Sequence, residues 1–208
     1  MSLPNKLSLF RILVIPVLLV ALLWGGAEPE DPWVAAWLRV LALVIVIVAA
    51  VTDWLDGHIA RRRGLSSTLG KLLDPLADKL LVTAAFVAFI DLRLFPSWLI
   101  VIILCREFLV TGLRTLAAAE GVVLAADRWG KHKTGWQLAT IITAITFVAA
   151  REFLRATGHW APGSPLLEEW RAQVVFDAVL HALLGVAVVL TVVSGWLYVS
   201  RNRGLLRE

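Results

Sequence analysis

Apolar residues fill six long runs of this chain, and short polar or charged segments separate each run from the next. Runs of this length and composition are typical of helices that cross a bilayer, where every backbone polar group must be satisfied within the helix. Residues 1–10 are mildly amphipathic and predict a short juxtamembrane helix. The predicted spans are residues 9–24, 33–52, 76–89, 96–119, 135–150 and 174–199. The pattern therefore predicts an all-α, polytopic membrane protein with a single domain over residues 1–208.

Basic residues lie at the N-terminus, after the second span, after the fourth span and at the C-terminus. The other connecting segments are acidic or balanced. Basic segments stay on the cytoplasmic side, so we expect six spans with both termini in the cytoplasm. Tryptophans near the span ends are typical of interfacial anchors. These are Trp24, Trp33, Trp37, Trp98, Trp136 and Trp196.

Composition agrees with a membrane protein: 59% of the 208 residues are hydrophobic and the mean hydropathy is +0.80. The formal net charge of +4 is modest and favours contact with anionic membrane lipids. We expect no nucleic-acid partner. The single cysteine, Cys105, excludes an intrachain disulfide and a cysteine zinc site, and its apolar neighbours predict a buried thiol.

Four aspartates lie where the second span ends and the third begins. Asp53 and Asp56 are three residues apart, and Asp74 and Asp78 are four apart, so each pair shares one helix face. Antiparallel packing would bring the pairs together, and their mutual repulsion then calls for cations. Oxygen-only ligands suit Mg²⁺, and two divalent ions can clamp both oxygens of a displacement at phosphorus.

Two other readings of these aspartates stay open. They could form a solvated helix-end cluster that pairs with Arg61, Lys71 and Lys79. They could also belong to a divalent-cation transporter, in which intramembrane acids line the ion path. A transporter should carry acids near the middle of several spans, whereas these four lie at one edge.

Small and basic residues accompany the aspartates. Gly57 and Ala60 permit close helix packing or leave room for a flat ligand such as a base. Gly70 suits a tight turn, and Arg61 suits either a phosphate contact or a cytoplasmic orientation signal.

The spacing D-x2-D-G-x2-A-R-x8-G-x3-D-x3-D resembles the signature of the CDP-alcohol phosphatidyltransferase family. Every position matches: Asp53, Asp56, Gly57, Ala60, Arg61, Gly70, Asp74 and Asp78. The resemblance implies six transmembrane helices, a homodimer and a site for Mg²⁺ or Mn²⁺, and the charge argument above favours two ions. It also implies transfer of a phosphatidyl group from CDP-diacylglycerol to an alcohol, with release of CMP.

The same resemblance implies residue roles. Asp53, Asp56 and Asp74 would chiefly hold metal and the CDP group, with Asp78 as the general base, either as a fourth metal ligand or free of the metal. Gly57, Ala60, Arg61 and Gly70 would belong to the CDP-lipid site. Asn5, Ser8 and Arg11 recur every three residues along one side of a helix, in a region that covers the nucleotide in this family. Hydrogen bonds from Asn5 and Ser8 to the nucleotide compete with helix capping as their role.

The flanking segments 3–16, 106–114 and 121–134 resemble bacterial phosphatidylglycerophosphate synthases. This implies glycerol 3-phosphate as the acceptor and a multi-pass protein of the bacterial cytoplasmic membrane whose active site faces the cytosol. Other acceptors within the family are inositol phosphate, serine and phosphatidylglycerol.

A phosphorylated acceptor agrees with the basic residues. Arg106 and Arg114 are eight residues apart and share a helix face. With Lys131 and Lys133 they would bind the acceptor's phosphate. The alternatives are a packing salt bridge between Arg106 and Glu107, and membrane-surface charge for the two lysines.

Overall fold

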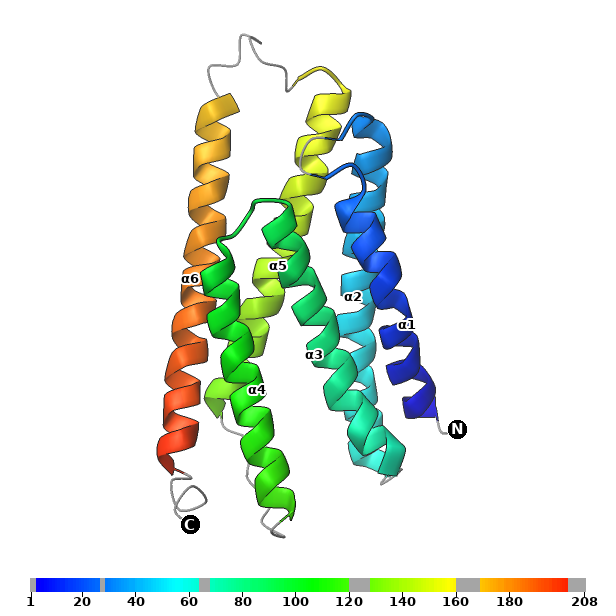
Figure 1. The fold of residues 1–208 in the computed structure, drawn as a ribbon. Coiled ribbons are helices and arrows are strands. Elements are labelled where there is room, and N and C mark those ends of the chain that lie inside the picture. Colours follow the sequence, from blue (N-terminus) through cyan, green and yellow to red (C-terminus); the bar gives the residue numbers. More distant parts are fainter. Residues whose placement is uncertain (1–2, 27–28, 64–67, 120–127, 160–168, 202–208) are drawn as a thin grey trace. The chain divides into compact units, whose positions relative to one another are not determined.

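The computed structural model describes residues 3–26, 29–63, 68–119, 128–159 and 169–201. At residues 3–7, 54–63, 68–76, 78, 119, 128–131 and 169–172 it describes the backbone alone. All regular secondary structure in these ranges is α-helical, which confirms the predicted class (Figure 1). The helices are α1 (Leu3–Leu23), α2 (Pro32–Arg63), α3 (Thr68–Asp91), α4 (Ser97–Ala119), α5 (Arg128–Ala156) and α6 (Glu169–Arg201).

The chain forms two compact units. Unit 1 comprises Met1–Leu94 and Ile141–Phe176, and unit 2 comprises Phe95–Thr140 and Asp177–Glu208. Unit 1 thus holds α1, α2, α3, the second half of α5 and the first turns of α6. Unit 2 holds α4, the first turns of α5 and most of α6.

Local sequence signals set the connection between α1 and α2. Gly25 and Gly26 follow α1 with φ angles of 72° and 68°, the left-handed conformation that ends many helices. Asp31 caps α2 because its Oδ1 accepts hydrogen bonds from the amides of Trp33 (3.0 Å) and Val34 (3.2 Å). Pro32 then occupies the first helical position, where its missing N–H costs nothing.

Three helix boundaries differ from the sequence prediction. Residues 3–10 are helical as predicted, but they do not form a separate juxtamembrane helix, because α1 runs without interruption from Leu3 through Pro16 to Leu23. A proline removes only one backbone bond, and neighbouring helices can support such a break. The basic segments after the second and fourth predicted spans are largely helical: α2 continues to Arg63, and α5 begins at Arg128.

Small residues bring the helices of unit 1 close together. α1 packs against both α2 and α3. Buried alanines recur on these helices, among them Ala21, Ala42 and Ala77, and such residues let helix backbones approach closely. Phe86 and Phe89 of α3 are fully buried and meet edge to face, with ring centroids 6.3 Å apart.

In unit 2, α6 carries one regular buried face. Its buried positions advance by three or four residues at a time, as the inward stripe of a packed helix does. They include Leu180, Leu184, Ala187, Thr191, Ser194 and Tyr198. Tyr198 joins Val110 and Leu113 of α4 in one apolar cluster, so α4 and α6 are neighbours.

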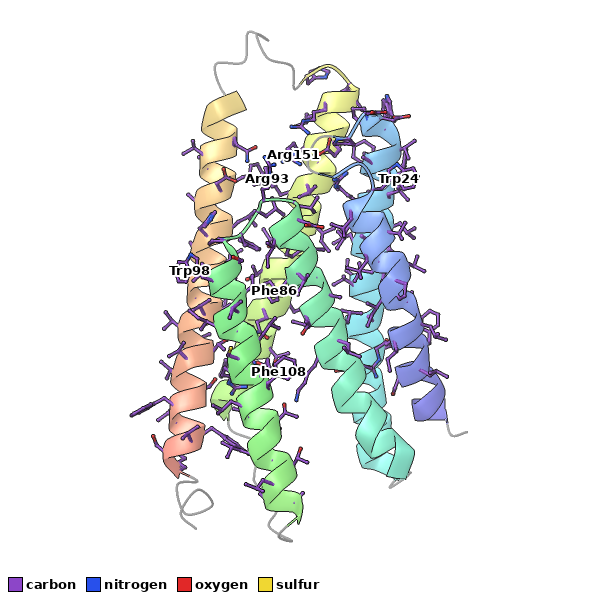
Figure 2. The ribbon with its side chains drawn as sticks, viewed as in Figure 1. Trp24, Phe86, Arg93, Trp98, Phe108 and Arg151 are labelled. Atoms are coloured by element: carbon purple, nitrogen blue, oxygen red, sulfur yellow. The ribbon has the colours of Figure 1, made fainter. Side chains whose placement is uncertain are left out.

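Many large apolar side chains are exposed, including Phe108 and Trp196, as expected for a surface that faces lipid. The six tryptophans predicted as interfacial anchors are all exposed; Figure 2 labels Trp24 and Trp98. Cys105 is also exposed, so the predicted burial of this thiol is wrong: it lies on an outward face of α4.

Within the described residues, three segments are long and apolar enough to cross a membrane: Pro32–Asp53, His132–Ala156 and Gln173–Arg201. Ser8–Leu23 is a shorter apolar helix. The helix α4 carries three charged residues, Arg106, Glu107 and Arg114, within its apolar sequence. The complete six-span topology therefore stays a prediction.

Candidate active site

The aspartate motif lies on two neighbouring helices of unit 1. Asp53, Asp56, Gly57, Ala60 and Arg61 belong to the last turns of α2. Gly70, Asp74 and Asp78 belong to the first turns of α3. Figure 1 shows the end of α2 and the start of α3 at the same end of unit 1, beside the first turns of α1. The predicted antiparallel arrangement of the two helices is present in the backbone.

Two details of the motif differ from the prediction. Gly70 lies inside the first turns of α3, so it is not a turn residue of the connecting loop. Arg61 lies within α2, whereas the sequence pattern predicts it in the basic connecting segment after the second span. Because both halves of the motif are helical, the motif residues within each half are separated along the helix axis by about 1.5 Å per residue.

Asp53 is the one motif residue whose side chain the structure describes. Its Oδ1 accepts a hydrogen bond from Nη1 of Arg11 on α1 at 2.6 Å. Arg11 is buried, whereas 44% of the Asp53 side chain is exposed. A buried guanidinium needs a charged partner, and Asp53 supplies one while keeping access to solvent. The region of α1 around Arg11 is the one that the resemblance places over the nucleotide. This ion pair joins that helix directly to the aspartate motif.

Ser8 is fully buried three residues before Arg11, on the same side of α1. The side chains of Asn5, Asp56, Gly57, Ala60, Arg61, Gly70, Asp74 and Asp78 lie outside the described part of the structure. Among the described side chains there is no group of three or more potential metal ligands. Three of the four predicted metal-binding aspartates are outside that set, so the metal site stays a prediction.

A second group of charged side chains lies in unit 2, and Glu107 of α4 is at its centre. Nζ of Lys133 on α5 donates a hydrogen bond to Oε1 of Glu107. Nη1 of Arg106 lies 3.5 Å from the same oxygen. We call Arg106, Glu107 and Lys133 the Glu107 cluster. It brings together two of the four residues predicted to bind the acceptor's phosphate.

The predicted loop position of the two lysines is wrong, because α5 already includes both. Lys133 is buried, and the side chain of Lys131 lies outside the described part of the chain. Buried Gln137 and Thr140 follow Lys133 at helical spacing, so one side of α5 carries a buried polar stripe. The i, i+4, i+7 spacing of these polar residues is the sequence pattern that predicts such a stripe.

Arg114 is exposed two turns beyond Arg106 on α4. Its Nε donates a hydrogen bond to the hydroxyl oxygen of Tyr198 at 3.2 Å. The guanidinium carbon also lies 5.5 Å from the centroid of the Tyr198 ring, within cation–π range. Both predicted arginines therefore have contacts with α6, a helix to which the sequence analysis assigns no site residue.

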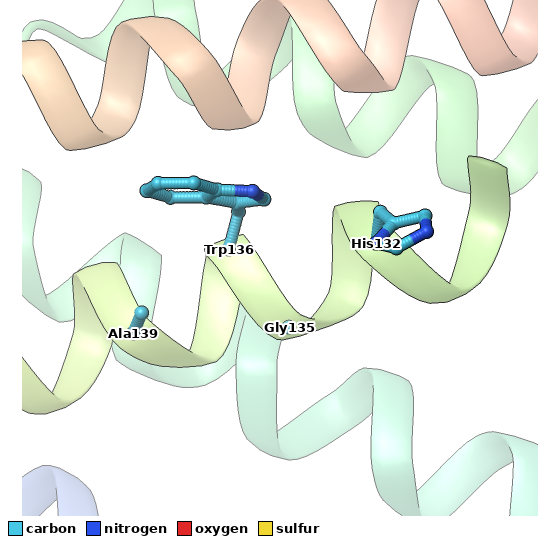
Figure 3. A pocket seen from close by; sticks show the side chains of 4 residues that line it. All are labelled: His132, Gly135, Trp136 and Ala139. Carbon is cyan, nitrogen blue, oxygen red and sulfur yellow. The ribbon is translucent and has the colours of Figure 1, made fainter.

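A hollow of about 300 Å³ lies along another side of α5. Its described lining residues are His132, Gly135, Trp136 and Ala139, which share one helix face. Figure 3 shows the His132 and Trp136 side chains on the same side of α5. None of these residues is among the predicted site residues.

Comparison with known proteins decides the family. The family described as CDP-alcohol phosphatidyltransferase matches residues 1–193. This chain belongs to the CDP-alcohol phosphatidyltransferase family.

Similar proteins cover from two thirds to all of this chain. The CDP-diacylglycerol–glycerol-3-phosphate 3-phosphatidyltransferase of Bacillus subtilis is 38% identical over 97% of this chain and 95% of its own length. The enzyme of the same name from Cereibacter sphaeroides is 31% identical, with 100% and 98% covered. A probable phosphatidylglycerophosphate synthase of Mycobacterium tuberculosis is 38% identical over 67% of this chain and 64% of its own length.

The sequence analysis missed one further charged group of this phosphatidyltransferase. In unit 1, Nε and Nη2 of Arg151 donate to Oε1 of Glu152 at 3.1 and 3.0 Å, and Arg155 lies 3.4 Å from the same carboxylate. Arg39 of α2 interacts electrostatically with these residues and donates from Nη2 to the carbonyl of Gly26 at 2.7 Å. We call Arg39, Arg151, Glu152 and Arg155 the Glu152 cluster.

Arg39 precedes Asp53 by 14 residues on α2, so the Glu152 cluster lies about 20 Å along the helix from the aspartates. Figure 2 labels Arg151 on α5, toward the other end of unit 1. An arginine in the middle of an apolar run is the sequence signal for such a group.

Proposed function

We propose that this chain is a phosphatidylglycerophosphate synthase. It transfers the phosphatidyl group of CDP-diacylglycerol to glycerol 3-phosphate and forms phosphatidylglycerol phosphate and CMP. The observation that carries this proposal is the similarity to the Bacillus subtilis enzyme over 97% of the chain, which includes the complete aspartate motif and the basic residues of α4 and α5.

The motif's four aspartates offer only oxygen donors, and these suit Mg²⁺ or Mn²⁺. We propose that Asp53, Asp56 and Asp74 hold two such ions, with Asp78 contributing. Bound metal would supply positive charge to the pyrophosphate of the CDP-lipid. The partly exposed carboxylate of Asp53, held from one side by Arg11, is compatible with this role.

Residues of the chain itself bind the CDP-lipid and accept the proton of the acceptor. Asn5, Ser8, Gly57, Ala60, Arg61 and Gly70 form the CDP-lipid site. Asp78 accepts the proton of the acceptor's 1-hydroxyl group. That oxygen attacks the β-phosphorus of the CDP-lipid, the bond from this phosphorus to the CMP oxygen breaks, and CMP leaves. Positioning of the two substrates contributes most of the rate increase.

Cations of α4 and α5 bind the acceptor's phosphate: Arg106, Arg114, Lys131 and Lys133. Glu107 holds Lys133 and Arg106 near one point, which supports a shared role for these two. Guanidinium groups suit phosphate because they donate two parallel hydrogen bonds.

The membrane arrangement is part of the proposal. Six helices cross the bacterial cytoplasmic membrane, both termini lie in the cytoplasm, and the aspartates face the cytosol. The acyl chains of CDP-diacylglycerol stay in the bilayer while glycerol 3-phosphate enters from the cytosol. We expect a homodimer, as in the family.

Release of CMP by the purified protein tests the acceptor. CDP-diacylglycerol and Mg²⁺ or Mn²⁺ are supplied with glycerol 3-phosphate, inositol phosphate, serine or phosphatidylglycerol in parallel. We expect turnover with glycerol 3-phosphate alone. Turnover with only another alcohol would refute the acceptor while retaining the phosphatidyl transfer.

The role of Asp78 is tested by Asp78→Asn, with Asp91→Asn near the other end of α3 as the matched control. We expect Asp78→Asn to abolish turnover and to leave the Kd for CDP-diacylglycerol nearly unchanged. The control should behave as the wild type because Asp91 is exposed at the last position of α3. An equal loss of CDP-diacylglycerol binding in Asp78→Asn would contradict its role as the base.

A further inference from the structure

We propose that α6 positions the two arginines of the acceptor site through Ser194, Gly195 and Tyr198. This inference rests on the proposed function, because it assigns Arg106 and Arg114 to the phosphate of the acceptor. The three α6 residues would be positioning residues: they contact the arginines and have no assigned contact with the substrate.

Ser194 holds the end of the Arg106 side chain. Nη2 of Arg106 donates a hydrogen bond to Oγ of Ser194 at 3.0 Å. The Ser194 hydroxyl donates its own proton to the carbonyl of Thr191 at 3.0 Å. Its lone pairs are thereby directed away from the α6 backbone, toward the guanidinium. A buried serine of this kind selects one orientation of the arginine.

Gly195 provides the space for the stem of Arg106. A Cβ atom on Gly195 would lie 2.8 Å from Cγ of Arg106 and 3.6 Å from its Nε. The first distance is shorter than carbon atoms tolerate, and Cγ is near the root of the side chain. Any larger residue at this position would therefore displace Arg106, although it would suit the helix itself.

Tyr198 provides the corresponding contact for Arg114. Its ring is buried against Val110 and Leu113, so the hydroxyl group is held in place by apolar packing. That hydroxyl accepts the hydrogen bond from Nε of Arg114, and the ring lies within cation–π range of the guanidinium. A tyrosine fixed by its core contacts therefore orients an arginine that is otherwise exposed.

The consequence for binding is entropic. A free arginine side chain loses rotamer freedom when it binds a ligand, and this loss weakens binding. Ser194 and Tyr198 lie four residues apart, so one face of α6 orders both arginines before the acceptor arrives. We expect this ordering to lower the KM for glycerol 3-phosphate and to leave the KM for CDP-diacylglycerol unaffected.

The decisive variant is Gly195→Ala, with Gly185→Ala as the matched control. Gly185 lies on the same helix, and a Cβ atom there would meet nothing within 4 Å. For Gly195→Ala we expect the KM for glycerol 3-phosphate to rise about tenfold or more, because Arg106 loses its position. The KM for CDP-diacylglycerol and the Tm should match those of Gly185→Ala.

A second pair of variants covers the case in which Gly195→Ala does not fold. Ser194→Ala and Tyr198→Phe each remove one hydroxyl group without adding volume, and Tyr198→Phe keeps the ring. We expect each to raise the acceptor KM roughly threefold, since each removes one hydrogen bond that orients an arginine. A wild-type acceptor KM in both variants, or in folded Gly195→Ala, would overturn the inference.

The wild-type assay separates this inference from the proposed function. If the wild type releases CMP with glycerol 3-phosphate and the α6 variants keep its KM, the inference fails and the function stands. If the wild type turns over only with serine, the proposed function fails, and the inference fails with it because no acceptor phosphate is bound.

Discussion

The Glu107 cluster and the Glu152 cluster contain the same chemistry, one glutamate among basic side chains, but they differ in burial. The Glu152 carboxylate is fully buried, whereas the Glu107 side chain keeps 18% of its surface exposed. Arg39 is fully buried as well, while Arg106 remains 13% exposed. The outer basic residues do not follow this difference, because Arg155 is 26% exposed and Lys133 is buried. We expect a cluster whose carboxylate is sealed from solvent to serve the fold, whereas a cluster whose carboxylate solvent partly reaches can also meet a ligand.

This difference separates two roles that the sequence alone does not distinguish. In both clusters an arginine stands directly before a glutamate within an apolar helix: Arg106–Glu107 on α4 and Arg151–Glu152 on α5. The 3.5 Å contact between Arg106 and Glu107 agrees with a salt bridge that serves packing, and it also agrees with a role for Arg106 in binding the acceptor's phosphate. Four substitutions address this comparison.

The largest effect is expected from Glu152→Gln. Loss of this buried carboxylate would leave Arg39, Arg151 and Arg155 without the charge that they share. Breaking a buried ion pair costs about 3–5 kcal/mol, so the Tm in detergent should fall by roughly 10 °C. The KM values of the remaining folded enzyme should not change. Glu30→Gln, the same substitution at an exposed position, is the control, and an equal Tm in both variants would contradict a structural role for the cluster.

Glu107→Gln should be less destabilising than Glu152→Gln. Solvent reaches part of the Glu107 cluster, so we expect a loss of about 1–2 kcal/mol, between the values for surface and buried pairs. Thermal unfolding of the two variants side by side measures this difference. A Tm loss as large as that of Glu152→Gln would show that the two clusters serve the fold equally.

Arg114→Ala should alter acceptor binding without altering stability. Arg114 is exposed, and its removal leaves the apolar cluster around Tyr198 intact. We expect the KM for glycerol 3-phosphate to rise about tenfold, as for the loss of one charged hydrogen bond to phosphate, with little change in the KM for CDP-diacylglycerol. An unchanged acceptor KM would remove Arg114 from the acceptor site.

The smallest effect is expected from Phe153→Leu, beside Glu152. The Phe153 ring meets Trp33 and Trp37 edge to face, with centroids 6.1 and 5.4 Å apart. Leucine keeps the apolar contact and loses the aromatic geometry, so we expect a loss of about 1 kcal/mol. A Tm decrease similar to that of Glu152→Gln would assign the stability of this region to aromatic packing instead of charge.

The sequence predicted the helical class well because apolar runs and helix signals are local. Asp31 and Pro32, for example, start α2 through contacts with the next three residues. Predicted boundaries failed where charged residues extend a helix beyond its apolar part, as at Arg63 and Arg128. A polar side chain does not end a helix; it changes only which part of the helix can lie in lipid.

By itself, the sequence determined the family, the eight-residue aspartate motif and the basic residues that accompany it, because these are spacings along one chain. Only the tertiary structure joined Arg11 to Asp53, placed Lys133 on Glu107, and brought Ser194 and Tyr198 of α6 to the two arginines. Each contact joins residues 26 to 88 positions apart. Such contacts depend on which helix faces meet, and packing over the whole helix sets that choice, because a shift of one residue turns a side chain by about 100°.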